Sequence, residues 1–270
     1  MFFLSYSNVF NKIDTLDTLS SIIAALGHDL GHPAVTNRFL VNNRDKLAIE
    51  YNDSSVLENM HAAGTFKLMD KEESNIFLNL SNNDWFRARK LIIEMILQTD
   101  MSRHFEILGK FKTRAVTLSD FDIQVDEDKN QVLAMGLKCA DIGHSCKPEE
   151  LHYRWSQRVC EEFFNQGDLE KAHSQPVSMY CDRNTTDVSK SQAGFIKNIC
   201  IPLYEVWCTY LNSEEVTRTC LEQLKANLDM WTRRSKVRRN TTYSKTSDLL
   251  DEPSKARSSG ELTKIRNTDY

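Results

Sequence analysis

Residues 16–29 read LDTLSSIIAALGHD and carry the pattern that decides the fold. Apolar side chains recur at positions 16, 19, 22, 23 and 26, which is the spacing of one face of an α-helix. Gly and Pro residues follow the apolar run and predict that the helix ends before Pro33. The helix therefore places His28 and Asp29 next to each other at its C-terminal end.

Helical periodicity recurs along the chain, whereas no alternating strand pattern or internal repeat stands out. Only 9 Gly and 5 Pro occur in 270 residues, which argues against a β architecture with many turns. The sequence predicts an all-α fold, a compact bundle of many helices, with long connections over 113–128 and 168–188. The further predicted helices fall in 54–69, 83–100, 129–144, 149–166, 189–211 and 213–232.

Composition is that of an ordinary globular protein, with 40% hydrophobic and 27% charged residues. No apolar run reaches the 18 or so residues of a membrane span, and the first 12 residues lack the basic start of a signal peptide. The 7 cysteines are odd in number and form no C-x-x-C pair, which is typical of a reducing compartment. We expect a cytoplasmic protein without a membrane span.

Charge divides the chain into two parts. Residues 233–270 contain 10 Lys and Arg against 5 Asp and Glu, whereas residues 1–232 contain 24 against 33. The basic part is rich in Ser and Thr and poor in apolar residues, so it is predicted to be a disordered tail. The acidic body gives no support to nucleic-acid binding, and we expect no nucleic-acid partner.

The His28–Asp29 pair has two interpretations. A histidine at the C-terminal end of a helix can simply interact with the negative end of the helix dipole. An aspartate at the same end is electrostatically unfavourable, and a bound metal ion would remove that cost. The pair alone leaves both interpretations open.

Other polar residues in apolar helical patterns are equally ambiguous one by one. Asp141 ends the apolar run VLAMGLKCAD and is either an exposed turn residue or a carboxylate paired with a cation. Glu58 and His61 share a helical face, but Ser55-x-x-Glu58 also matches a capping box, which only marks a helix start. Considered together, these nitrogen and oxygen donors form a plausible site for Zn, Mn, Mg or Fe in a hydrolytic centre.

Several motifs resemble a known family in their order and spacing. The stretch HDLGHPAVTNRFLVNNRDKLAIEYNDSSVLENMH is similar to the signature region of class I cyclic nucleotide phosphodiesterases, a branch of the HD metallohydrolases. The resemblance continues through LQTDMSRHF, CADIGHSCKP, HYRWSQRVCEEFFNQGD and SKSQAGFI, and it covers residues 10 to 232. It implies an all-α catalytic domain that hydrolyses 3′,5′-cyclic nucleotides, cAMP or cGMP, to 5′-monophosphates.

The resemblance also implies roles for individual residues. His28, Asp29 and Asp141 would ligate a zinc ion, and Asp29 would also lean toward a second ion, Mg or Mn, held mainly through waters. Residues around the metals would orient these ligands and waters, namely His32, Glu58, His61 and Thr99, with Asn37 steadying the loop beside them. On the substrate side, Gln192 would hydrogen-bond the purine, and Phe195 and Val159 would clamp the base.

One motif of the family is missing from these residues. The family carries H-N-x-x-H-x-x-D-V before the His-Asp pair, supplying the catalytic general acid and a further zinc ligand, but no His precedes His28 here. General acid catalysis contributes about 10²–10⁴-fold to rate, so we expect the chain as given to be a weak or inactive enzyme. Three hypotheses follow: an N-terminally incomplete phosphodiesterase, a phosphodiesterase-like module that binds nucleotide without turnover, and an HD hydrolase of another phosphate ester. The purine-clamp pattern disfavours the third.

Overall fold

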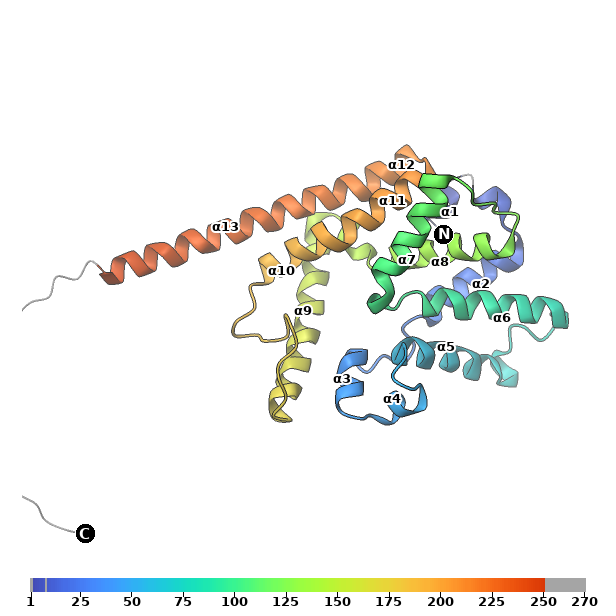
Figure 1. Ribbon diagram of the computed structural model, residues 1–270, viewed down its shortest axis with the longest axis horizontal. Coiled ribbons are helices and arrows are strands. Elements are labelled where there is room, and N and C mark those ends of the chain that lie inside the picture. The colour runs from blue at the N-terminus through green and yellow to red at the C-terminus, as the bar shows by residue number, and fades with distance from the viewer. Residues whose placement is uncertain (1, 8, 251–270) are drawn as a thin grey trace, which may run out of the picture.

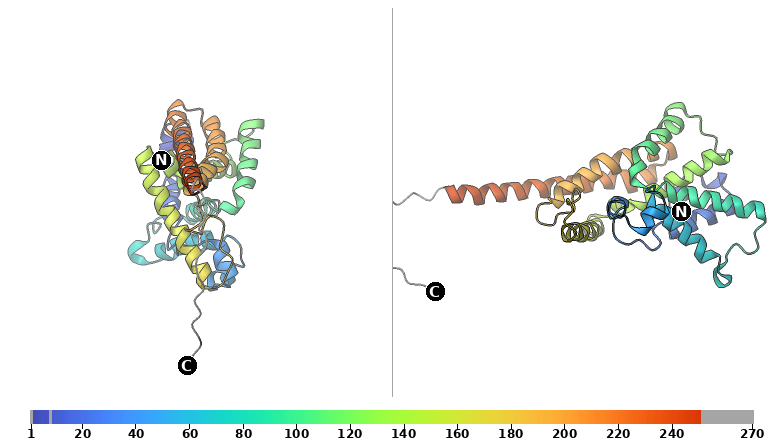
Figure 2. Two further views of the ribbon diagram at one scale, coloured as in Figure 1. Left: turned by 90° about the vertical axis from the view of Figure 1, so that its left-hand side faces the viewer. Right: turned by 60° about the horizontal axis from the view of Figure 1, so that its bottom comes forward.

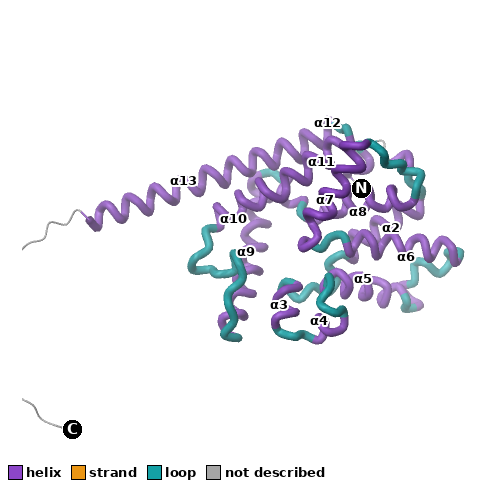
Figure 3. The backbone as a smooth tube through the Cα atoms, in the orientation of Figure 1, coloured by secondary structure: helices purple, strands orange, loops and turns teal. Residues whose placement is uncertain are grey.

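The computed structural model describes residues 2–7 and 9–250 and is built from helices joined by loops (Figures 1 and 3). No strand occurs among these described residues, and the predicted all-α fold is confirmed. The α-helices are α1 (Phe2–Ser5), α2 (Thr15–Gly27), α3 (Asn37–Asn42), α4 (Lys46–Glu50), α5 (Val56–Met69), α6 (Asn82–Leu97), α7 (His104–Phe111), α8 (Asp126–Asp141), α9 (Glu149–Ala172), α10 (Val188–Phe195), α11 (Ile201–Leu211), α12 (Glu214–Val216) and α13 (Gln223–Leu250). Short 3₁₀ and π segments lie between them: η1 (Phe10–Lys12), η2 (Glu72–Ser74), η3 (Met101–Arg103), η4 (Lys112–Leu118), η5 (Gly143–Cys146), η6 (Ile196–Cys200) and η7 (Thr217–Glu222).

The core of the bundle forms where α6 packs between α2, α5 and α8. Ile92 and Ile96 of α6 and Val132 of α8 are fully buried there. Farther along the same cluster, Trp207 of α11 is also fully buried. Burial of one apolar face of each of these helices therefore fixes how they cross.

The apolar face predicted for α2 is wrong in part: Ile23 is buried, but Ile22 and Leu26 are 40% and 80% exposed. The buried side of α2 consists mainly of small and polar residues, namely Asp17, Ser20, Ser21, Ala24 and Gly27.

An ion-pair network sets the register of α2 against α8. The buried carboxylate of Asp17, in the first turn of α2, lies 2.7 Å from the Arg87 guanidinium of α6 and 3.1 Å from the Lys129 ammonium of α8. Both helices therefore start at this network and run in the same direction. Because residues 17 to 28 and 129 to 141 span nearly equal rises, the two helices also end side by side, which brings His28 to Asp141.

The connections differ in part from the predicted ones. The π-helical segment η4 and an early start of α8 reduce the predicted 113–128 connection to a loop over 119–125. Helix α9 continues to Ala172, so the second connection covers 173–187 rather than 168–188. The first turn of α8 and the last turns of α9 are polar and lack an apolar stripe, so periodicity did not predict them.

Helix α13 is long and projects away from the rest of the bundle (Figures 1 and 2). It extends across the predicted tail boundary at 232, and that division of the chain stays a prediction. The remainder of the predicted tail, 251–270, lies outside the described residues. Over the described part of the chain, no helix combines the length and apolar character that a membrane crossing requires.

Candidate metal centre and adjoining cavity

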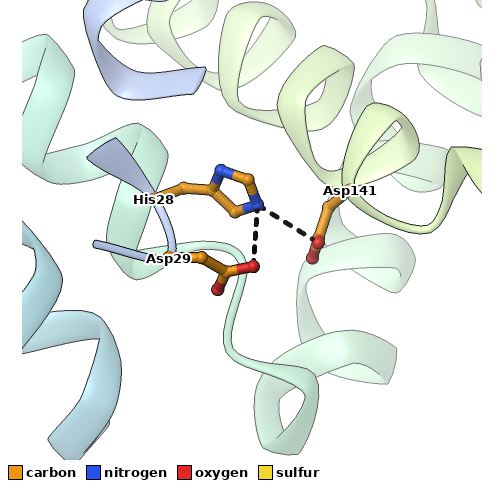
Figure 4. A group of neighbouring side chains, drawn as sticks. All are labelled: His28, Asp29 and Asp141. Carbon is orange, nitrogen blue, oxygen red and sulfur yellow. Dashed lines mark ion pairs between the residues drawn. The ribbon is translucent and has the colours of Figure 1, made fainter. Parts of the chain in front are cut away.

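His28, Asp29 and Asp141 converge at the ends of two parallel helices (Figure 4). His28 caps the C-terminus of α2, and its Nδ1 donates to the Ala25 carbonyl oxygen at 2.9 Å. This hydrogen bond directs Nε2 away from the helix. The same Nε2 lies 3.3 Å from Asp29 Oδ2 and 3.4 Å from Asp141 Oδ1, and Asp141 is the last residue of α8.

A glycine permits this helix end to approach α5. A Cβ atom at Gly27 would lie 2.2 Å from Thr65 Oγ1, far inside van der Waals contact. The absence of a side chain therefore lets the last turn of α2 sit directly against α5. As a result, His61 of α5 comes to lie beside Asp29.

Electrostatics favour a positive charge in the cluster. Hydrogen bonds to Asp141 and then to Asp29 raise the pKa of His28 to about 10 when no metal is bound. The hydrogen bond from His28 in turn lowers the pKa of Asp29. A protonated imidazole thus supplies the positive charge that the two carboxylates need, and a metal ion that replaces the proton would supply it equally.

The donor set fits a divalent ion. One ligand atom from each of the three residues lies within 4.8 Å of the other two, as binding to a common ion requires. An imidazole nitrogen with two carboxylate oxygens, and no thiolate, suits zinc or magnesium chemistry. The geometry therefore favours the metal interpretation of His28–Asp29 over a simple helix-end histidine.

Two further histidines lie beside this cluster. The buried His61 donates from Nδ1 to the Leu30 carbonyl oxygen at 2.8 Å. Its Nε2 has no hydrogen-bond partner and lies 3.8 Å from Asp29 Oδ1. The His32 ring stacks on His61 with centroids 5.6 Å apart. A buried, unpartnered nitrogen facing the cluster is the position expected of a residue that orients a ligand or a water.

Glu58 is held by a network and not by a capping box. The Asn37 amide nitrogen donates to Glu58 Oε2 at 2.9 Å, and the Leu57 backbone N–H donates to Asn37 Oδ1 at 2.8 Å. Ser55 makes no side-chain cap, and its hydroxyl donates to Asp100 Oδ2 at 2.7 Å. The capping-box interpretation is therefore wrong. Burial raises the pKa of Glu58.

The segment that follows α6 makes hydrogen bonds through one hydroxyl group and two carbonyl oxygens. The Thr99 hydroxyl donates to the Ile96 carbonyl oxygen at 2.8 Å, within its own turn. Sequence reasoning missed the buried Lys138, whose ammonium donates to the carbonyl oxygens of Gln98 at 3.0 Å and Asp100 at 3.4 Å. A lysine in an otherwise apolar helical run, one turn before Asp141, was the available signal.

A cavity of about 1220 Å³ opens beside the cluster. Its wall includes Asp29, His32, Asp141, His144 and Val159. Metal-cluster carboxylates and an apolar side chain thus face the same space, which is large enough for a nucleotide-sized ligand.

The remaining predicted substrate residues are placed differently. Neither Gln192 nor Phe195 is part of the cavity wall in this structure. The Gln192 amide nitrogen donates to Cys160 Sγ at 3.6 Å, and its Oε1 is buried without a partner. Phe195 packs against the main apolar core. The purine clamp of Phe195 and Val159 stays a prediction.

The fold and the site together define a helical domain in which a carboxylate–histidine cluster, a candidate metal site, lies beside a large cavity. The sequence profile of the 3′,5′-cyclic nucleotide phosphodiesterase family matches residues 1–224. The chain belongs to this family.

Individual relatives agree with this assignment. The chain is 39% identical over 221 residues to 3′,5′-cyclic-AMP phosphodiesterase 4C of Rattus norvegicus, covering 80% of this chain and 41% of the relative. It is 40% identical over 225 residues to the dual 3′,5′-cyclic-AMP and -GMP phosphodiesterase beta of Plasmodium falciparum (isolate 3D7), covering 83% and 20%. The chain thus spans less than half the length of these relatives.

A solved structure is also similar. The phosphodiesterase domain of the RhoPDE fusion protein from the choanoflagellate Salpingoeca rosetta superimposes with a TM-score of 0.80 at 32% sequence identity. The similarity covers 84% of this chain and 72% of that domain. The shared fold therefore includes most of both chains.

Proposed function

We propose that this chain is a catalytic segment that hydrolyses 3′,5′-cyclic nucleotides, cAMP or cGMP, to 5′-monophosphates. The observation that carries the proposal is the His28–Asp29–Asp141 cluster, whose two carboxylates line the cavity of about 1220 Å³. Membership of a phosphodiesterase family supports the reaction class. All seven cysteines are free, which supports the further proposal that the protein works in the cytoplasm.

His28 Nε2 and the carboxylates of Asp29 and Asp141 would hold a zinc ion, with Asp29 shared with a second ion, magnesium or manganese. Such ions, when bound, activate water and neutralise charge on the phosphate. His61 donates from Nδ1 to a backbone carbonyl, which leaves Nε2 as an acceptor facing Asp29. Together with His32 it would orient waters in the cavity mouth.

Substrate contacts extend the proposal beyond the metal cluster. Val159 lines the cavity and would pack against one face of the purine. Gln192 and Phe195 would complete the purine site when α10 presents them to the cavity. The unpartnered Oε1 of Gln192 supports a role in ligand binding because a buried acceptor without a donor is costly. Asn37 and Thr99 would hold the loops beside the metals.

We also propose that these 270 residues turn over slowly by themselves. No His precedes His28 to act as the general acid of the family pattern, which removes about 10²–10⁴-fold in rate. The alternative is a module that binds nucleotide without hydrolysis. The unpartnered Oε1 of Gln192 and the His28–Asp29–Asp141 cluster fit both versions, so turnover decides between them.

The test is hydrolysis of cAMP and cGMP by the purified 270-residue chain supplied with zinc and magnesium, with parallel titrations of metal and of 5′-AMP and 5′-GMP. We expect slow, chelator-sensitive turnover that disappears in Asp141→Asn but persists in Asp70→Asn, an exposed carboxylate at the end of α5. Nucleotide binding without turnover would select the binding module. Failure to bind either metal or nucleotide would overturn the proposal, and turnover at about 1–10³ s⁻¹ would contradict the missing-acid argument.

A further inference from the structure

The 173–187 loop runs back along α9 on its way to α10 (Figures 1 and 3). Successive residues of the loop contact successively earlier residues of α9. The contacts are those of Ser178 with Glu170, Cys181 with Gly167, and Arg183 with Asp168, Asn165 and Glu161. The loop therefore lies antiparallel on the C-terminal half of α9, and its register on that helix determines where α10 begins.

Glu170 is the buried anchor of this register, with 2% of its surface exposed. Its Oε2 accepts a hydrogen bond from the Ser178 backbone N–H at 2.7 Å. Its Oε1 accepts from the Ser178 hydroxyl at 2.6 Å and from the Gln166 amide nitrogen at 2.9 Å. Within the described part of the chain, no ion pair involves this carboxylate. Three donors thus replace the water that the carboxylate loses on burial, and two of them belong to Ser178.

Gln166, one turn earlier on α9, connects the anchor to α3. Its Nε2 donates to Glu170, and its Oε1 accepts from the Thr36 backbone N–H at 2.9 Å. Thr36 caps the N-terminus of α3. At the other end of α3, the C-cap residue Asn43 accepts from the Gln175 amide of the loop at 2.9 Å. Both ends of α3 are therefore tied to α9 or to the loop, which holds the anchor in one place.

The position of Gln192 follows from the register of the loop. Asp187, the last residue of the loop, caps α10 by accepting from the Lys190 backbone N–H at 3.1 Å. Gln192 of α10 then donates to Cys160 Sγ of α9 at 3.6 Å. Val159, the neighbour of Cys160, lines the cavity. A shift of the loop along α9 would carry α10 with it and separate Gln192 from Cys160.

We propose that Glu170 is a positioning residue for the nucleotide, acting through the loop that leads to α10. By holding Ser178, it fixes the register of the loop on α9 and hence the place of Gln192. The inference rests on the proposed function, which assigns Gln192 to the purine. The carboxylate is needed because it only accepts hydrogen bonds, whereas an amide of the same shape would present an NH₂ group to at least one of the three donors.

Two substitutions disturb the loop by different physical routes. Glu170→Gln removes the anchor without changing its size. Gly167→Ala pushes the loop outward, because a Cβ there would lie far inside van der Waals contact with the Cys181 carbonyl oxygen. Glu150→Gln, at an exposed position near the start of α9, is the matched control. The first readout is the rate at which iodoacetamide alkylates each cysteine of the folded 270-residue chain, followed by tryptic mass mapping, and it needs no nucleotide.

Cys160 and Cys181 report on the loop, because both are buried where it meets α9. Each lies in a tryptic peptide of its own, separate from the other five cysteines. We expect both thiols to be alkylated about tenfold faster in Glu170→Gln, the fold-change of losing one hydrogen bond to a charged group, and faster in Gly167→Ala as well. The other five cysteines, and all seven in Glu150→Gln, should keep the wild-type rate. Unchanged rates at Cys160 and Cys181, or an equal increase at all seven cysteines, would overturn the proposal.

The second readout connects Glu170 to the nucleotide. Glu170→Gln should weaken 5′-AMP binding by about 5-fold and leave zinc affinity unchanged. In a Gln192→Ala background the same substitution should have no further effect, because the side chain that it displaces is already absent. Additive losses in the double variant would refute the positioning role. A wild-type chain that binds no 5′-AMP would instead contradict the proposed function, and the alkylation rates would still decide whether Glu170 holds the loop.

Discussion

The candidate metal cluster and Gln192, the residue predicted to bind the purine, differ in how the backbone holds them. In the metal cluster, His28 and Asp141 lie at the C-terminal ends of two parallel helices whose first turns are joined by the Asp17 ion pairs. Gln192 lies on the short helix α10, which follows the 173–187 loop, and its amide faces Cys160 rather than the cavity.

The difference shows how far helix packing determines the candidate metal cluster. Once α2 and α8 pack in register, the positions of their C-terminal residues are fixed. The position of Gln192 depends instead on the 173–187 loop and on how α10 packs. The metal cluster and Gln192 should therefore respond differently to substitution.

The largest difference in zinc affinity is expected between the His28→Ala and Gln192→Ala variants. Removing the only imidazole in the three-residue cluster should weaken zinc binding by at least about 100-fold, more than the usual cost of losing a supporting residue. Gln192→Ala should leave zinc affinity unchanged because its side chain does not contact the cluster. Isothermal titration with zinc, followed by metal analysis after dialysis, measures both.

The affinity for 5′-AMP should also differ between these variants. Gln192→Ala should weaken its binding by about 5- to 10-fold, the value of one hydrogen bond to a neutral partner. An equal loss of zinc affinity in both variants would show that the metal cluster and the segment carrying Gln192 fold as one unit. That result would contradict the expected difference between them.

The sequence predicted the fold well where apolar residues repeat. Positions 16, 19, 22, 23 and 26 lie in α2, and the run before Asp141 lies in α8. The helix was predicted correctly but its buried face was not, because Ile22 and Leu26 are exposed and small residues such as Ala24 and Gly27 are buried instead. Helix ends were less predictable: polar surfaces such as the end of α9 carry no apolar stripe, and the reach of α13 past 232 has no sequence signal of this kind. Helices stabilised by local hydrogen bonds and by distant packing cannot be bounded from periodicity alone.

The convergence of the candidate metal ligands could be predicted because the sequence shows an electrostatic mismatch, namely an acid at the C-terminal end of an apolar helix. Asp29 and Asp141 both show it. Lys138 and the bond between Ser55 and Asp100 were not predictable because they depend on which backbone carbonyls and side chains packing brings together.

A smaller but still large effect is expected beside the metal cluster from Gly27→Ala. The new methyl group would overlap Thr65 and force α2 away from α5, which should lower the free energy of unfolding by about 3 kcal/mol. Gly109→Ala is the matched control, because a Cβ there meets nothing within 4 Å, and it should be neutral or stabilising by about 0.5–1 kcal/mol. Urea unfolding measures both, and equal values in the two variants would contradict the close approach.

The smallest expected effect is a dependence of the free energy of unfolding on pH. This dependence has opposite signs at His152 and at His28. Behind His144, the fully buried His152 accepts a hydrogen bond from Trp231 Nε1 at 2.8 Å, and burial lowers its pKa to about 4. The unfolded chain, with a histidine pKa near 6.5, then binds more protons, so this residue destabilises the fold as pH falls from about 6.5 to 4.

His28 acts in the reverse direction in the metal-free protein. Its pKa of about 10 means that its stabilising contribution is present below pH 6.5 and is lost as pH rises toward 10. The free energy of unfolding of the metal-free chain, measured with urea at pH 7, 6 and 5, should fall as the pH is lowered. His152→Gln should reduce this fall by up to about 1.4 kcal/mol per pH unit, because glutamine can still accept a hydrogen bond from Trp231 but does not titrate. An acid slope unchanged by His152→Gln would place the titrating group elsewhere, and the next candidate is His104, whose buried ring has a pKa lowered to about 4.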